Sequence, residues 1–141
     1  MYSKSKAVTL ATAQTLTGSD AVVGDTSANG VFDVRNNREV SIFLDWAKAS
    51  ATALEILVEA SPVSTGDDWY PLVLGADAGA SFSAGAVTQT SGTLRHSITV
   101  TGKHHLPARV FGAHRLRVKA KETGTPGGTL TLKVTAVQEA S

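Results

Sequence analysis

The chain of 141 residues contains no cysteine. It therefore cannot form a disulfide bond, and it offers no thiolate as a nucleophile or metal ligand. Aromatic residues make up only 6% of the chain and charged residues 18%, while 42% of the residues are hydrophobic. This length and composition suit one globular domain with a single two-layer core.

Long apolar runs are also missing, so we expect no membrane-spanning segment. Near the N-terminus, Lys4 and Lys6 precede a short apolar stretch, as they would in a secretory signal. Thr9 interrupts this stretch, which is too short for the apolar region of a signal peptide. We therefore expect a protein that stays inside the cell in which it is made.

Sequence motifs of catalysis are absent as well. The glycine-rich residues 75–85 lack the lysine that follows the glycines of a phosphate-binding loop. No serine stands in the Gly-x-Ser-x-Gly arrangement of a nucleophile elbow. We therefore expect the protein not to be an enzyme.

The four histidines are the candidates for a metal site, and they all lie in the last third of the chain: His96, His104, His105 and His114. Zinc sites usually combine ligands with recognisable spacing and often include a carboxylate. No acidic residue stands between Asp77 and Glu122. We therefore expect neither a metal ion nor any other cofactor.

Alternation of apolar and polar residues is the strongest pattern that is present. It runs through residues 39–46, 93–100, 115–121 and 129–136. Such alternation is typical of antiparallel strands with one buried face. Turn-forming residues separate the runs, so the sequence predicts an all-β fold, an antiparallel two-sheet β-sandwich of the jelly-roll or immunoglobulin-like type.

Local details refine this prediction. Residues 123–128, with the sequence TGTPGG, join the last two runs and are predicted to close a C-terminal β-hairpin. Residues 45–60 are rich in alanine, but alternation within them favours a connection over 47–52 and a strand over 53–60. We expect residues 1–17 to form an N-terminal arm or edge strand and residues 18–141 to form the single sandwich domain.

Charge is unevenly distributed along the chain. Residues 1–94 hold five basic and ten acidic side chains, whereas residues 95–141 hold eight basic and two acidic ones. The basic part contains a stripe of cations at every second position, namely Arg115, Arg117, Lys119 and Lys121. These side chains share one face of a strand, and Lys133 lies on the predicted hairpin partner.

The basic stripe has three interpretations. The leading one is pairing with carboxylates such as Glu55 and Glu59, either within the fold or between subunits. The second is a binding surface for a protein partner, formed by the four cations together with Lys133. The third is nucleic-acid binding, which the sequence does not favour: sheet surfaces that read nucleic acids normally carry aromatic side chains for base stacking, and this strand has none.

Asp67, Asp68, Trp69 and Tyr70 form the most acidic and aromatic short stretch. The simpler interpretation is a polar turn that feeds Trp69 and Leu72 into the core. Adjacent residues of an extended chain point apart, so the two carboxylates are poorly placed for acid–base catalysis. Alternatively, the four residues could line a carbohydrate-binding groove, in which aromatic faces and carboxylates contact the sugar.

Two passages of the chain resemble a known group of proteins: EVSIFLDWAKASATALEILVEASPVSTGDDWYPL and FGAHRLRVKAKETGTPGGTLTLKVTAV. Their order of strands and turns is similar to that of small β-sandwich virion proteins of tailed bacteriophages. The resemblance covers roughly residues 36–137 and concerns strands and turns rather than a catalytic motif. It implies a non-enzymatic protein that assembles in the host cytoplasm, is located in the virion and often forms trimers.

Together these observations lead to one expected function. The protein is expected to be a capsid decoration or cement protein that binds the major capsid protein or other virion proteins as a homo-oligomer, with a trimer favoured. The alternatives are a neck or tail component of the virion and a carbohydrate-binding module. No membrane association is expected.

Overall fold

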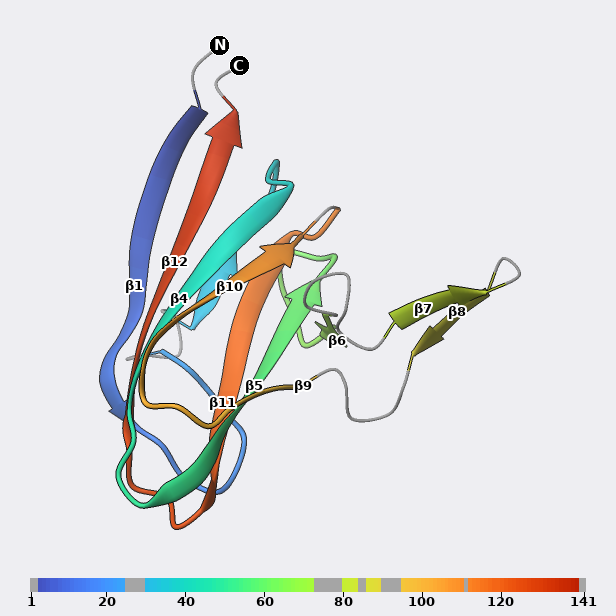
Figure 1. Cartoon of the computed structure of the whole chain (residues 1–141). Coiled ribbons are helices and arrows are strands. Elements are labelled where there is room, and N and C mark those ends of the chain that lie inside the picture. The colour runs from blue at the N-terminus through green and yellow to red at the C-terminus, as the bar shows by residue number, and fades with distance from the viewer. Residues whose placement is uncertain are drawn as a thin grey trace.

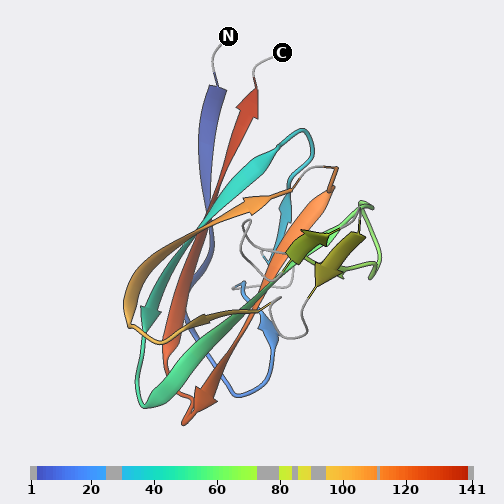
Figure 2. The same cartoon turned by 45° about the vertical axis from the view of Figure 1, so that its right-hand side comes forward.

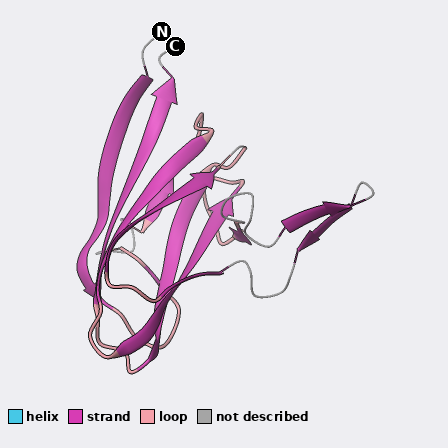
Figure 3. Cartoon of the chain, viewed as in Figure 1, coloured by secondary structure: helices cyan, strands magenta, loops and turns pink. Residues whose placement is uncertain are grey.

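The computed structural model describes residues 3–24, 30–72, 80–83, 86–89, 95–110 and 112–139. Strands are the regular elements of these residues (Figures 1 and 3). They are β1 (Ser3–Thr15), β2 (Ala21–Val22), β3 (Val31–Asp33), β4 (Glu39–Ala47), β5 (Ala51–Ser61), β6 (Tyr70–Pro71), β7 (Ala80–Ser83), β8 (Ala86–Gln89), β9 (Arg95–Ile98), β10 (Gly102–Arg109), β11 (Arg115–Gly124) and β12 (Thr129–Glu139). Among the described residues there is no helix long and apolar enough to span a membrane.

Two antiparallel sheets pack face to face and confirm the predicted β-sandwich. The first, which we call sheet A, has the strand order β1-β12-β4-β10. The second, sheet B, has β11 and β5 at its centre, with β2 and β3 beside β11 and with β6 and β9 beside β5. Strands β7 and β8 pair only with each other and stand outside the two sheets in Figure 1.

The predicted C-terminal hairpin is wrong in its pairing. The turn after Gly124 does join two antiparallel strands, but β11 pairs with β5 in sheet B and β12 pairs with β1 and β4 in sheet A. Figure 2 shows the two strands diverging from this turn into separate layers. Alternation reveals that each strand has a buried face, but it does not say which strand lies beside it.

The strand predicted over residues 53–60 is confirmed, and it is longer than expected. β4 continues to Ala47 and β5 begins at Ala51, so the connection between them is only three residues long. This connection also crosses from sheet A to sheet B. Two crossings of the core, β4 to β5 and β11 to β12, therefore lie at the same end of the sandwich.

Most of the core is formed by the alternating residues of β4, β5, β11 and β12. Side chains of β4, β5, β11 and β12 that point inward are almost completely buried, and they include Val40, Ile42, Leu44, Trp46, Leu54, Ile56, Val58, Leu116, Val118, Leu130, Leu132 and Val134. Full burial of one such aliphatic side chain contributes about 1.5–3 kcal/mol to the free energy of unfolding. The same alternation leaves the other residues of each strand on the outer face of its sheet.

β1 lies at the edge of sheet A and is paired with β12 along most of its length. Two irregularities between Thr9 and Gln14 bend it, and Leu10 and Leu16 are buried in the core. Residues 3–15 of the predicted arm are thus an edge strand of their own chain. Their N-terminal part and the end of β12 extend past the rest of the sheet as a two-stranded ribbon (Figure 1).

Candidate partner-binding surfaces

The basic stripe lies on the outer face of sheet B. Leu116, Val118 and Ala120 of β11 are buried, which directs the intervening cations away from the core. Arg115 donates hydrogen bonds to the carbonyl oxygens of Val63 (2.7 Å) and Gly66 (3.0 Å). Its side chain therefore holds the segment that follows β5 against the sheet.

The next two cations of the stripe meet a carboxylate of the neighbouring strand. Arg117 Nε lies 2.9 Å from Glu59 Oε1, and Lys119 Nζ lies 3.4 Å from the same oxygen. Arg117 and Glu59 are direct partners in the β11–β5 register, and both side chains are largely buried. Pairing within the chain, one of the three interpretations of the stripe, is therefore confirmed for these two cations.

Trp69 is not in the core, contrary to the simpler expectation for its segment. The guanidinium carbons of Arg115 and Arg117 lie 4.6 Å and 4.2 Å from the centre of its ring. Such cation–π contacts are favourable because the ring face carries partial negative charge. Trp69 thus covers the arginines on the outside of sheet B, while Leu72 packs against the core.

The candidate carbohydrate-binding residues share this segment but do not form an open aromatic floor. The arginines take up part of the surface of Trp69 that a sugar would need. Asp67 and Asp68 are exposed, and Arg117 Nη1 approaches Asp67 Oδ1 at 3.8 Å. Tyr70 is 57% exposed, and its hydrogen bond to Asp68 raises the pKa of its hydroxyl.

A second charge cluster extends along the outer face of sheet B. Arg95 of β9 forms a two-pronged ion pair with Asp20, at 2.8 Å and 2.5 Å. Glu55 accepts a hydrogen bond from Ser97 and is the register partner of Lys121. The pKa of Asp20 is lowered, chiefly by the hydrogen bonds from Arg95 and in part by the positive charges of two lysines of the stripe.

This ion pair predicts a defined response to acid. Because the pKa of Asp20 in the folded protein lies below its ordinary value of 3.8, the pair stabilises the fold above that value and is lost as the pH falls through the folded pKa. We expect the D20N variant to lose less stability on acidification than the parent protein. Urea unfolding at neutral pH and at about one unit below the ordinary Asp pKa measures this difference.

The matched control is D33N. The pKa of Asp33 is also lowered, chiefly by its hydrogen bond to Arg35, but that pair is more than half exposed. Solvent screens such a pair, so D33N should flatten the acid response less than D20N. An equal effect of both variants would contradict a special contribution of the Asp20–Arg95 pair.

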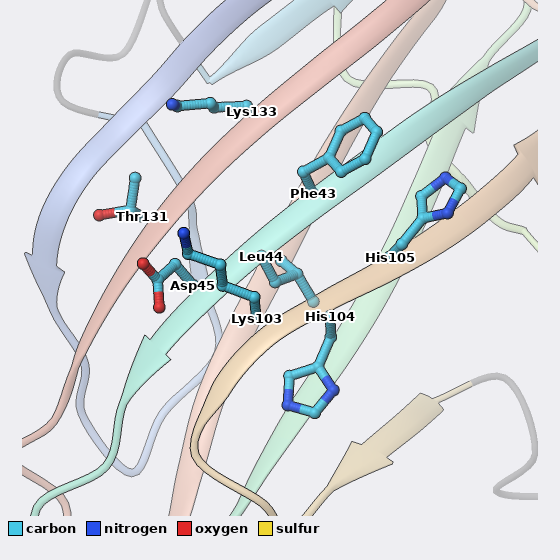
Figure 4. Close-up of a pocket in the computed structure, with 8 residues that line it drawn as sticks. All are labelled: Phe43, Leu44, Asp45, Lys103, His104, His105, Thr131 and Lys133. Atoms are coloured by element: carbon cyan, nitrogen blue, oxygen red, sulfur yellow. The ribbon is translucent and has the colours of Figure 1, made fainter.

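Lys133, the fifth predicted partner-binding cation, lies on the opposite side of the molecule from the other four. It belongs to β12 and points outward from sheet A. With Phe43, Asp45, Lys103 and His105 it lines a shallow depression of about 400 Å³ (Figure 4). The five predicted partner-binding cations therefore lie on two different surfaces, four on the outer face of sheet B and Lys133 on the outer face of sheet A.

Phe43 and His105 are two of the residues that line this depression. Their rings stack at 4.6 Å between centroids with an interplanar angle of 6°. They are direct partners in the β4–β10 register, and Phe43 remains 42% exposed. His104 points the other way along β10, and its Nε2 lies 2.7 Å from the carbonyl oxygen of Val100.

The expected absence of a metal site remains a prediction. Within the parts of the chain that the structure describes, no group of three or more His, Asp or Glu side chains could hold a metal ion together. The glycine-rich residues 75–79 and 84–85 and the start of the run at 93–94 lie outside the described residues.

Glu122 is an important buried residue that the sequence interpretation did not single out. Its side chain is only 1% exposed, and Oε2 accepts a hydrogen bond from Trp46 Nε1 at 2.8 Å. Oε1 accepts hydrogen bonds from the backbone of Gly127 and Gly128, both at 2.9 Å. Continuing the period of two from Ala120 would have placed Glu122 on the buried face and identified it.

Comparison with known proteins gives a likeness of fold. No family model matches the sequence, and no curated protein matches it either. The SPBc2 prophage-derived protein YomS has a TM-score of 0.51 and 15% identity, over 98% of this chain and 96% of its own. The PBSX exported protein XepA has a TM-score of 0.55 and 15% identity, but this chain spans only 39% of it.

A third similar structure comes from Bacillus endospore appendages, which form disulfide-linked pili. Its TM-score is 0.50 at 7% identity, over 99% of this chain and 93% of that one. At these identities the likeness concerns the arrangement of strands. The three similar structures are thus a prophage-derived protein, an exported protein and a pilus of endospore appendages.

Proposed function

We propose that this protein is a non-enzymatic structural protein of a phage virion, and more specifically a capsid decoration or cement protein that binds the major capsid protein lattice. Its assembly takes place in the host cytoplasm, after which it is part of the virion. It acts as a homo-oligomer, with a trimer favoured, and it requires no cofactor.

The observation that carries this proposal is the likeness to a prophage-derived protein over nearly the full length of both chains. The form of the molecule supports it, because a sandwich with outward-facing sheet surfaces can contact identical neighbours in a lattice. The likeness to a pilus subunit points to assembly as well. Disulfide links between subunits cannot apply here because the chain has no cysteine.

Binding to purified capsids that lack the protein tests the proposal. We expect the protein to co-sediment with such capsids up to a fixed number of copies and to raise the temperature at which they disrupt. A mutant virion without the protein should show the opposite change. Absence of binding to capsids would refute the decoration function.

A neck or tail component is the alternative within the same class. It predicts that the protein binds assembled tails or the unique capsid vertex instead of the lattice, in far fewer copies per particle. Electron microscopy of gold-labelled protein on virions separates the two, because decoration gives label over the whole capsid surface and a neck protein gives label at one vertex.

A further inference from the structure

On the outer face of sheet A, two aromatic side chains lie close to two lysines and one aspartate. In the strand register, Lys133, Phe43 and His105 lie in one row across β12, β4 and β10. Thr131, Asp45 and Lys103 form the next row. Figure 4 shows these side chains on one side of the sheet, with the rings of Phe43 and His105 next to each other.

The two outer faces differ in how their aromatic residues are covered. On sheet B, Trp69 lies against two arginines of its own chain. On sheet A, Phe43 stacks on His105 and keeps 42% of its surface exposed. An exposed aromatic side chain in the middle of a sheet surface is typical of a contact site for another protein.

The faces also differ in how their cations are neutralised. On sheet B, Arg95, Arg117 and Lys119 each have a carboxylate of the same chain within ion-pair distance, whereas Lys121 has only its register partner Glu55. On sheet A, no described carboxylate comes within that distance of Lys103 or Lys133, although Asp45 is the register partner of Lys103. A carboxylate from outside would therefore meet a free amino group on either side of Phe43.

We infer that the outer face of sheet A binds an acidic segment of a partner protein, with an apolar side chain on the Phe43–His105 pair and carboxylates at Lys103 and Lys133. The inference rests on the proposed function for the identity of the partner as a capsid protein. It assigns partner binding to the face that holds Lys133 rather than to the stripe of β11, whose arginines are occupied within the chain.

The first test is independent of any capsid. The isotope-labelled protein is titrated with a synthetic peptide of alternating glutamate and leucine, and backbone NMR shifts are followed. We expect salt-sensitive shift changes in β4, β10 and β12 around Phe43, Lys103 and Lys133. Changes confined to sheet B, or none at all, would overturn the inference. Shift changes that depend on the concentration of the protein and not on that of the peptide would also overturn it. They would show that a second copy of this protein, and not an acidic segment, binds the outer face of sheet A.

The second test uses capsids and matched variants. F43A should weaken binding about tenfold or more, because it removes the aromatic anchor. K103Q/K133Q should weaken it roughly fivefold to tenfold and reduce its salt dependence. The controls are V100A, an exposed apolar residue that does not line the depression, and K119Q/K121Q, which removes two charges from sheet B.

The outcomes of the two tests separate the inference from the proposed function. Both controls should bind within about twofold of the parent protein if the inference holds. A loss in K119Q/K121Q with normal binding by K103Q/K133Q would assign the contact to the stripe and overturn it. If the parent protein binds no capsid, the proposed function fails, and the peptide titration still decides whether this face binds acidic segments.

Discussion

Replacement of Glu122 by alanine is expected to lower the free energy of unfolding by about 3–5 kcal/mol. The reason is the number of donors that this one carboxylate satisfies in the buried interior. Trp46 Nε1 and the backbone N–H groups of Gly127 and Gly128 all point at it. Without the carboxylate they would lack acceptors at the point where the chain crosses from sheet B to sheet A.

Two further variants make this prediction specific. E122Q keeps the shape but points an amide N–H₂ at one of the donors, so it should cost about 2–3 kcal/mol. E55A removes a partly exposed glutamate of β5 and should cost less than about 1 kcal/mol. Urea unfolding measures all three values. If the free energy of unfolding falls no more in E122A than in E55A, the buried hydrogen bonds of Glu122 contribute little to stability.

The second large effect is expected at Gly124, the last residue of β11. Its φ of +83° is costly for any residue with a side chain. A Cβ at this position would also overlap with Thr52 Oγ1 and lie 3.0 Å from the Thr52 backbone nitrogen. Strain and overlap together should make G124A about 2–4 kcal/mol less stable than the parent protein.

Gly66 provides a matched control for this variant. Its φ of +85° is almost the same, but no atom lies within 4 Å of the position that a Cβ would take. G66A should therefore show the backbone strain alone, about 1–2 kcal/mol. The difference between the two variants in urea unfolding measures the overlap with Thr52. Equal losses would mean that β5 moves aside without cost.

Much of the fold follows from alternation alone. The period of two correctly separates the buried Leu116 and Val118 from the outward Arg115 and Arg117. It also places Phe43 outward, on the polar side of its run. These results are predictable because each residue of a strand faces either the core or the outside, whatever strand lies next to it.

Spatial neighbours were harder to predict, because they depend on contacts between distant residues. Phe43 and His105 are 62 positions apart, and only the β4–β10 register brings their rings together. Trp69 lies in a segment without regular alternation, so the sequence pattern did not indicate which way its side chain points. Its ring contacts two guanidinium groups on the outside of sheet B instead of the core. Pairing of Arg117 with Glu59 was among the predicted alternatives, since alternation put both on polar faces, but their adjacency required the sheet order.

The antiparallel pairing of β1 with β12 has a mechanical consequence. Ser3 lies opposite Glu139, so both ends of the described chain lie side by side at one end of the ladder (Figure 1). A pulling force applied between these ends would break the backbone hydrogen bonds between β1 and β12 one pair after another, starting at the termini. Tension on the remaining sheet would rise only after β1 had peeled away, so the strand that closes the edge is also the one that yields first.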